Sequence, residues 1–138
     1  MEILWPAFGM FALTFAVAMA LVVKRFGAVA QKRVNPAFYK LYRDGQEPED
    51  VAVFTRHTSN LFEQPVLFYA VIVMAFATGL GGGAMVGVAW AYVVARYAHS
   101  AVHLFWNNVI RRVQVFALSW IALATLWVML GLRMAGKG

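Results

Sequence analysis

Long uncharged stretches separated by short charged segments dominate the pattern of hydrophobic and polar positions along the chain. Charged residues are absent from the 21 positions 3–23, the 32 positions 64–95 and the 20 positions 113–132. A helix needs about 20 mostly apolar residues to cross a bilayer core of ~30 Å. The middle stretch is too long for one crossing, and the glycine-rich segment 79–83 interrupts it with a turn signal. The pattern therefore predicts spanning helices at about 3–24, 57–78, 84–106 and 113–132.

This arrangement predicts an all-α membrane protein, a four-helix transmembrane bundle that forms a single membrane domain over residues 1–138. The composition agrees, because apolar residues make up 62% of the chain and charged residues 13%, whereas soluble domains run at about 45–50% and about 25%. The chain contains no cysteine. Disulfides, thiolate metal sites and a nucleophilic cysteine are therefore excluded, and any thiol chemistry must come from a substrate.

The net charge of +6 is concentrated in two of the predicted loops. Seven lysine and arginine residues lie between Lys24 and Arg56, and Arg111 and Arg112 separate the last two predicted spans. The positive-inside rule places both loops in the cytoplasm and both termini on the other side. We therefore interpret the charge as an orientation signal and a contact for membrane lipids, and we expect no binding to nucleic acid.

The long predicted cytoplasmic loop, at about 25–56, is the only sizeable segment outside the spans. Glu49 and Asp50 follow Pro48, and acidic side chains are favourable at a helix N-terminus because of the helix dipole. We therefore expect the second helix to begin at about Glu49, before it enters the membrane.

Polar residues form one stripe at the start of the second predicted span. Arg56, Asn60 and Glu63 are spaced i, i+4, i+7, which brings them to one face of a helix. Charged groups inside a bilayer are costly and need a reason to be there. Two interpretations remain open: the three side chains bind a zwitterionic ligand, or Arg56 and Glu63 form a pair that holds the helix end.

A second stripe lies on the third predicted span, where Arg96, His99 and His103 are spaced i, i+3, i+7. Arg96 is expected to face the bundle or a wet cavity rather than lipid. The i, i+4 spacing of the histidines also suits metal or haem ligands. No carboxylate or third histidine accompanies them on that helix, and His57 belongs to another. We therefore favour hydrogen-bonding histidines in a polar cavity, and we predict no metal site.

Together these features resemble the superfamily of membrane-associated proteins in eicosanoid and glutathione metabolism (MAPEG), which includes the microsomal glutathione transferases. The motif Arg56-x-x-x-Asn60-x-x-Glu63 is similar to the family motif at the start of its second helix. The segment Ala95-Arg96-x-x-His99-x-x-x-His103 is similar to the family's Ala-Arg-x-x-Tyr-x-x-x-Tyr pattern, with histidines in place of both tyrosines. Gln64 stands where the family often has Asn or Tyr.

The resemblance implies a homotrimer in which glutathione, as co-substrate, binds between protomers near the cytoplasmic face. It implies a transferase or peroxidase that acts on small apolar electrophiles, in a bacterial inner membrane. The binding residues it implies are Arg56, Asn60, Glu63, Gln64, Arg96, His99 and His103. Arg111 or Arg112 would take the place of the family's thiolate-stabilising arginine, and the sequence does not choose between them.

Two other classes of function remain open. One is a non-catalytic subunit or scaffold that keeps the fold and binds a larger membrane complex. Histidines in place of the two family tyrosines agree with such a loss of activity. The other is a lipid- or haem-binding membrane module that uses His99 and His103. A glutathione titration separates the glutathione-dependent transferase or peroxidase from both alternatives, and a visible absorbance spectrum identifies haem.

Overall fold

The computed structural model describes residues 1–42, 45–106 and 109–136, and every regular element in these ranges is helical. The elements are the short 3-10 helix η1 (Glu2–Leu4), α1 (Trp5–Ala30), the short α2 (Phe38–Leu41), α3 (Glu49–Ala77), α4 (Ala84–Ala101), the π-helical segment η2 (Val102–Trp106) and α5 (Val109–Ala135). The predicted all-α class is thus confirmed. Lipid offers no hydrogen-bond partners to the backbone, and in helices the backbone groups bond to one another instead.

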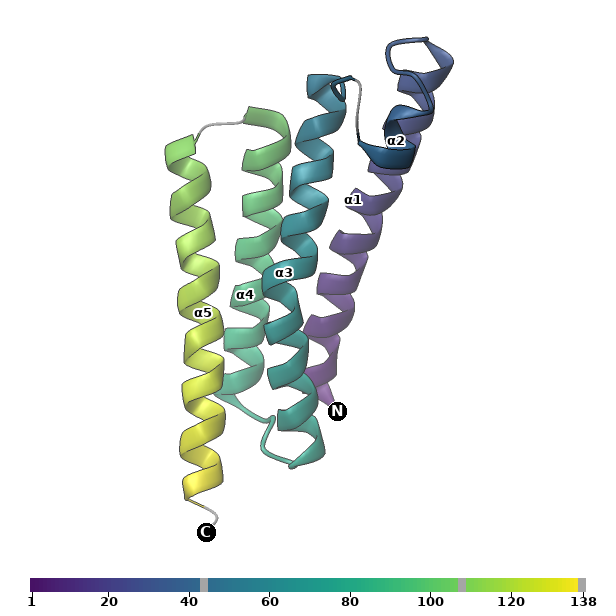
Figure 1. Cartoon of the computed structure of the whole chain (residues 1–138). Coiled ribbons are helices and arrows are strands. Elements are labelled where there is room, and N and C mark those ends of the chain that lie inside the picture. Colours follow the sequence, from purple (N-terminus) through teal and green to yellow (C-terminus); the bar gives the residue numbers. More distant parts are fainter. Residues whose placement is uncertain (43–44, 107–108, 137–138) are drawn as a thin grey trace.

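The four long helices run alternately up and down, and the two termini lie toward the end of the bundle that carries the α3–α4 turn (Figure 1). α4 packs along α5, and α1 packs along α3. At the centre, the rings of Phe68 and Tyr92 stack with centroids 4.2 Å apart and planes 13° from parallel. Both side chains are fully buried, so this aromatic pair joins α3 to α4.

Within the described ranges, three helical segments are long and apolar enough to cross a membrane, namely Glu2–Ala30, Glu49–Ala77 and Val109–Ala135. α1 shows how they meet lipid, because Phe8, Phe11 and Phe15 are exposed on its outer face while its opposite face is buried. α4 is not among the three: it has 18 residues, and they include the polar group Arg96, His99 and Ser100. The prediction that α4 also spans the membrane therefore remains a prediction.

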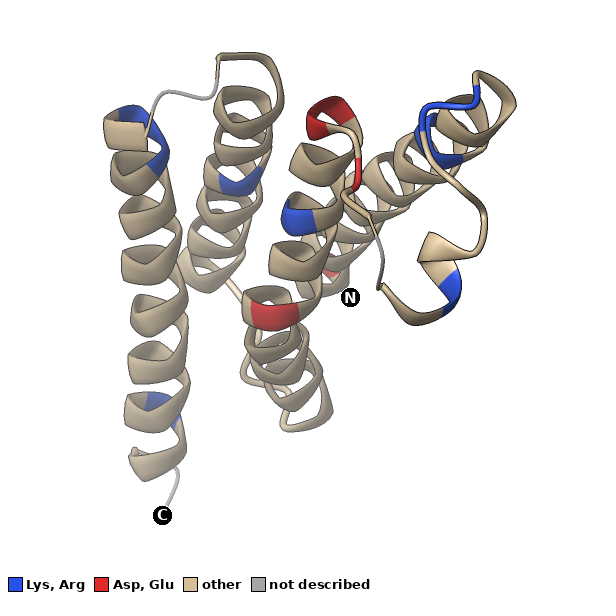
Figure 2. Ribbon diagram, turned by 45° about the horizontal axis from the view of Figure 1, so that its top comes forward, with Lys and Arg blue, Asp and Glu red and all other residues tan. Residues whose placement is uncertain are grey.

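The loop between α1 and α3 folds back onto the end of the bundle through Glu47. Its carboxylate accepts hydrogen bonds from Arg25 Nε on α1 (3.2 Å) and from Thr55 Oγ1 on α3 (2.7 Å). A second bridge joins Arg33 to Asp50, with Nη1 to Oδ1 at 2.8 Å. α3 begins at Glu49, directly after Pro48, as its acidic first turn predicts. Most of the lysine and arginine positions, blue on the ribbon, lie toward this end of the molecule (Figure 2).

The turn between α3 and α4 depends on glycine backbones. Gly79 has φ +68° and Gly83 has φ +58°, values that glycine adopts without the steric cost that other residues carry. At the other end, α4 passes into the wider π-helical segment η2, so the two together cover 84–106. π-helical turns inside α-helices are frequent at functional sites, and η2 carries His103.

Candidate functional site

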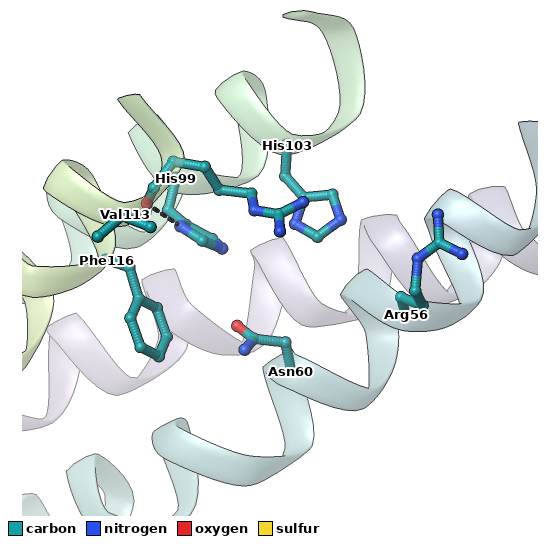
Figure 3. Close-up of a pocket in the computed structure, with 7 residues that line it drawn as sticks. Arg56, Asn60, His99, His103, Val113 and Phe116 are labelled. Atoms are coloured by element: carbon teal, nitrogen blue, oxygen red, sulfur yellow. Dashed lines mark hydrogen bonds between the residues drawn. The ribbon is translucent and has the colours of Figure 1, made fainter. Parts of the chain in front are cut away.

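A cavity of about 290 Å³ lies between α3, the α4–η2 segment and α5, at the end of the bundle that carries the charged loop. Its lining residues are Arg56, Asn60, His99, His103, Arg112, Val113 and Phe116. Figure 3 shows the side chains of Asn60, His99 and His103 directed toward a shared space, with Phe116 on one side. Five of the nine predicted site residues thus meet at one cavity.

Beneath the cavity, Arg96 is completely buried and held by amides rather than by a carboxylate. Its Nη1 donates to Gln64 Oε1 at 2.8 Å, and its Nη2 donates to Asn60 Oδ1 at 2.8 Å. Ser119 Oγ lies 3.2 Å from the same oxygen of Gln64. The expectation that Arg96 faces the bundle is met. Arg96 and Gln64 do not line the cavity. Gln64 holds Arg96, and Arg96 in turn holds the side chain of Asn60, which does line it.

Three histidines gather at the side of the cavity formed by α3, α4 and η2. The ring centroid of His57 lies 5.6 Å from that of His99 and 4.7 Å from that of His103. His57 Nε2 is 2.8 Å from Ser100 Oγ, and His99 Nδ1 is 3.3 Å from the backbone oxygen of Arg112. The cavity is therefore bordered by imidazoles where the family pattern has phenols.

Glu63, the acidic member of the predicted stripe, lies apart from the cavity. It is exposed on the outer face of α3, where its neighbours Phe62 and Val66 are exposed as well. Among the described residues Glu63 forms no ion pair with Arg56. The interpretation of the stripe as an internal Arg56–Glu63 pair is therefore not supported within one protomer.

The two adjacent arginines of α5 are placed differently. Arg112 is half-buried and lines the cavity, whereas Arg111 is exposed and does not. Consecutive helical residues point about 100° apart, so only one of such a pair can face a given cavity. In the structure Arg112 is the one that faces this cavity; the role of either arginine toward a thiolate stays a prediction.

His57, Ser100 and Phe116 contribute to the site without having been predicted as members. His57 is seven residues before Gln64 on α3, and only the packing of α3 against α4 brings it to His99 and His103. Ser100 follows His99 directly on α4, and its hydrogen-bond partner His57 lies on α3, so spacing along the chain does not single it out. Phe116 contacts Arg96 with its ring centroid 5.9 Å from the guanidinium carbon.

The arrangement suits an anionic or zwitterionic ligand with an apolar part. Arg56 and Arg112 supply two guanidinium groups, which bind carboxylates or phosphates in forked geometry. The amide of Asn60 supplies polar contacts, while Val113 and Phe116 form an apolar wall. Among the described residues no acidic side chain lines this cavity, so the electrostatic character of this lining is basic.

These features define an integral membrane protein with a polar, basic site at one end of its helix bundle. The model of the MAPEG family matches residues 3–132, which is nearly the whole chain, and the chain therefore belongs to the MAPEG family. Searches of curated proteins and of solved structures find no match. Family membership confirms the resemblance seen in the sequence and supports a membrane-bound, glutathione-related function at the level of the family.

Proposed function

We propose that the protein is a glutathione-dependent transferase or peroxidase that acts on apolar electrophiles dissolved in the membrane. The observation that carries this proposal is the basic cavity in which Arg56, Asn60 and Arg112 meet, in a chain of the MAPEG family. A cavity of about 290 Å³ is near the lower end of the range for small-molecule sites, ~300–1,000 Å³.

The chemistry of glutathione matches the lining of the cavity group by group. Glutathione carries two carboxylates, an ammonium, amides and a thiol. Arg56 binds a carboxylate, and Asn60, which Arg96 holds in place, binds an amide group. The side chains of His99 and His103 offer further hydrogen bonds next to Arg112. This assignment uses five of the residues that the resemblance implies.

Glu63 motivates the proposal of an assembly of protomers. A carboxylate on an outer helix face among exposed apolar side chains is expensive in lipid, and in one protomer it has no ion-pair partner among the described residues. A homotrimer with this face of α3 turned toward a neighbour removes the cost, and it brings Glu63 to the ammonium of glutathione bound between protomers. Gln64 and Arg96 then support the site from inside one protomer.

Arg112 is the proposed thiolate-stabilising residue. A free thiol has a pKa near 8.5, and a neighbouring cation lowers such a value by about 1–3 units. A glutathione thiolate beside Arg112 then attacks the electrophilic carbon, a C–S bond forms, and the leaving group departs with its electron pair. Phe116 and Val113 provide the apolar surface against which such an electrophile packs.

The proposal includes four membrane spans, with the basic loops in the cytoplasm and both termini outside. In that orientation the cavity opens near the cytoplasm, where glutathione is available. A Gly82→Cys variant tests the orientation, because this turn position has open space around it and the chain has no other cysteine. Labelling by an impermeant reagent from the outer face supports the orientation, and labelling only from the cytoplasmic face overturns it.

The function itself is tested by a conjugation assay with purified protein, glutathione and an apolar aryl halide, next to a peroxidase assay with an apolar hydroperoxide. Turnover above the uncatalysed rate in either assay, lost on Arg112→Ala, supports the proposal. Glutathione binding without turnover identifies a catalytically inactive member, and absence of both binding and turnover favours the scaffold function.

A further inference from the structure

The three histidines of the chain form one buried cluster at the wall of the cavity. His57 comes from α3, His99 from α4 and His103 from η2, and their exposed fractions are 0%, 3% and 7%. One ring nitrogen of each lies within 4.8 Å of the others. Such a convergence of buried imidazoles from three helical elements is a donor set for a transition metal.

The hydrogen bonds around His57 determine which of its nitrogens is available. Ser100 Oγ donates its only proton to the backbone oxygen of Arg96 at 2.9 Å. Ser100 Oγ must therefore act as the acceptor for His57 Nε2–H, at 2.8 Å. His57 Nδ1 then carries a lone pair, and this atom is buried without a hydrogen-bond partner.

The same logic applies to His99. The backbone oxygen of Arg112 can only accept, so His99 Nδ1 carries the proton in their 3.3 Å contact. His99 Nε2 is left with a lone pair and is also buried without a partner. Metal-binding histidines typically donate their other N–H to a carbonyl or similar group, which fixes the tautomer. Both His57 and His99 already have this arrangement.

His103 Nδ1 is the third imidazole nitrogen of this cluster that is buried without a hydrogen-bond partner. A buried polar atom without a partner is energetically costly, and here three such atoms belong to one cluster. We propose that His57, His99 and His103 bind one divalent transition metal ion, such as Zn²⁺ or Co²⁺, with a fourth coordination position open to the cavity.

The geometry requires only a small contraction of the cluster. Zn–N bonds of about 2.0–2.1 Å place tetrahedral ligand nitrogens roughly 3.4 Å apart. One ring nitrogen of each histidine lies within 4.8 Å of the others, so a shift of the side chains by about an ångström brings three nitrogens to this spacing. His103 lies on the π-helical segment η2, and such segments are frequent at functional sites.

The surroundings determine the nature of the fourth ligand. Arg56 and Arg112 line the cavity, Arg96 is buried next to it, and no carboxylate lines it in the part of the chain that the structure describes. Three neutral imidazoles leave the charge of a dication uncompensated, so binding is favourable only with an anion in the open position. The cavity admits such an anion: a chloride, a hydroxide or a thiolate. The inference rests on the geometry of the imidazoles and not on the proposed glutathione function. A bound metal ion takes the Nε2 of His99, which the proposed function offers to glutathione, so the two proposals are tested separately.

The test uses full-length protein without a histidine tag, purified in detergent, stripped with a chelator and titrated with Co²⁺ in chloride buffer. We expect one ion per chain, an intense visible spectrum of four-coordinate cobalt, and a change in that spectrum on addition of azide. Zn²⁺ should displace the cobalt, and elemental analysis should give one zinc per chain. No glutathione is present, so the outcome is separate from that of the proposed function.

Three variants sharpen the test. His99→Ala should weaken Co²⁺ binding more than about 100-fold, and Ser100→Ala, which removes the partner of His57, by about 10–100-fold. Thr125→Val on the exposed face of α5 is the matched control and should bind as the wild type does. Unchanged affinity of His99→Ala, or a stoichiometry other than one ion per chain, overturns the proposal.

A measurement on the wild type alone covers the case in which a variant fails to fold. Zn²⁺ should raise the melting temperature of the stripped protein, and a chelator should reverse the rise. The absence of any zinc-dependent shift, together with no cobalt spectrum, overturns the proposal.

Discussion

Arg96 and Gln64 are joined inside the bundle by a 2.8 Å hydrogen bond from the guanidinium Nη1 to the amide Oε1. Arg96 is fully buried and Gln64 nearly so, and no carboxylate is among the hydrogen-bond partners that the structure gives this arginine. The cation is thus solvated by two amides and a backbone oxygen, and it links α4 to α3 directly below the cavity.

The hydrogen bond between Arg96 and Gln64 predicts that Gln64→Leu lowers the stability of the protein considerably. The substitution leaves part of a buried guanidinium unsatisfied, which costs about 1–3 kcal/mol or more because the group is charged. We expect a lower melting temperature in detergent, measured by thermal unfolding. Gln64→Glu keeps an acceptor near Arg96 and should be clearly more stable than Gln64→Leu. Equal stability of the two variants would show that the bond contributes little.

Glu63→Gln tests whether the exposed carboxylate binds glutathione in the assembled protein. Loss of one charge-assisted hydrogen bond is worth about 1.5–3 kcal/mol, or more than about tenfold in affinity, measured by calorimetric titration. Glu49→Gln, the same change in the first turn of α3, is the control and should leave affinity unchanged. If Glu63→Gln instead lowers thermal stability equally with and without glutathione, the residue has a structural role.

The two adjacent arginines should respond differently to substitution. Arg112→Ala should lower turnover at least about tenfold while changing glutathione affinity little, the signature of an interaction made in the transition state. It should also move the thiolate titration, followed by ultraviolet absorbance, toward the value of a free thiol. Arg111→Ala is the matched control, with little effect on either quantity. Full activity in Arg112→Ala combined with inactivity of His99→Ala would transfer the role to histidine.

The packing of the loop between α1 and α3 against the bundle should depend on Glu47. The carboxylate is 9% exposed and is bonded to Arg25 and Thr55, so Glu47→Gln removes charge-assisted bonds worth about 1.5–3 kcal/mol. We expect tryptic cleavage after Lys40 to accelerate more than about tenfold, because proteolysis follows local opening. Cleavage in Glu49→Gln should match the wild type, and equal rates in all three proteins would contradict the assignment.

Much of the architecture could be predicted from the sequence because only a few kinds of secondary structure satisfy their backbone hydrogen bonds in lipid. Uncharged stretches of about 20 residues imply helices, and the glycine-rich segment 79–83 divided the longest stretch correctly between α3 and α4. The polar stripes indicated that Arg96 faces inward. Such arguments treat one helix at a time, and they determine which residues share a face.

Arguments from the sequence of single helices do not determine how the faces of different helices meet. For this reason the sequence could not bring His57 to His99 and His103, and it could not separate Glu63 from Arg56 and Asn60, which share its stripe but lie at the cavity. It also could not choose between Arg111 and Arg112, since that choice depends on the rotation of α5. Helix packing supplies each of these relationships.

Binding of glutathione to the purified wild-type protein tests the central claim most directly. In a membrane-mimetic environment, calorimetric titration should show saturable binding that raises the melting temperature and that weakens more than about tenfold in Arg56→Ala, because one forked carboxylate contact is lost. No saturable binding, or equal binding by the wild type and by Arg56→Ala, would contradict the account of this cavity as a glutathione site.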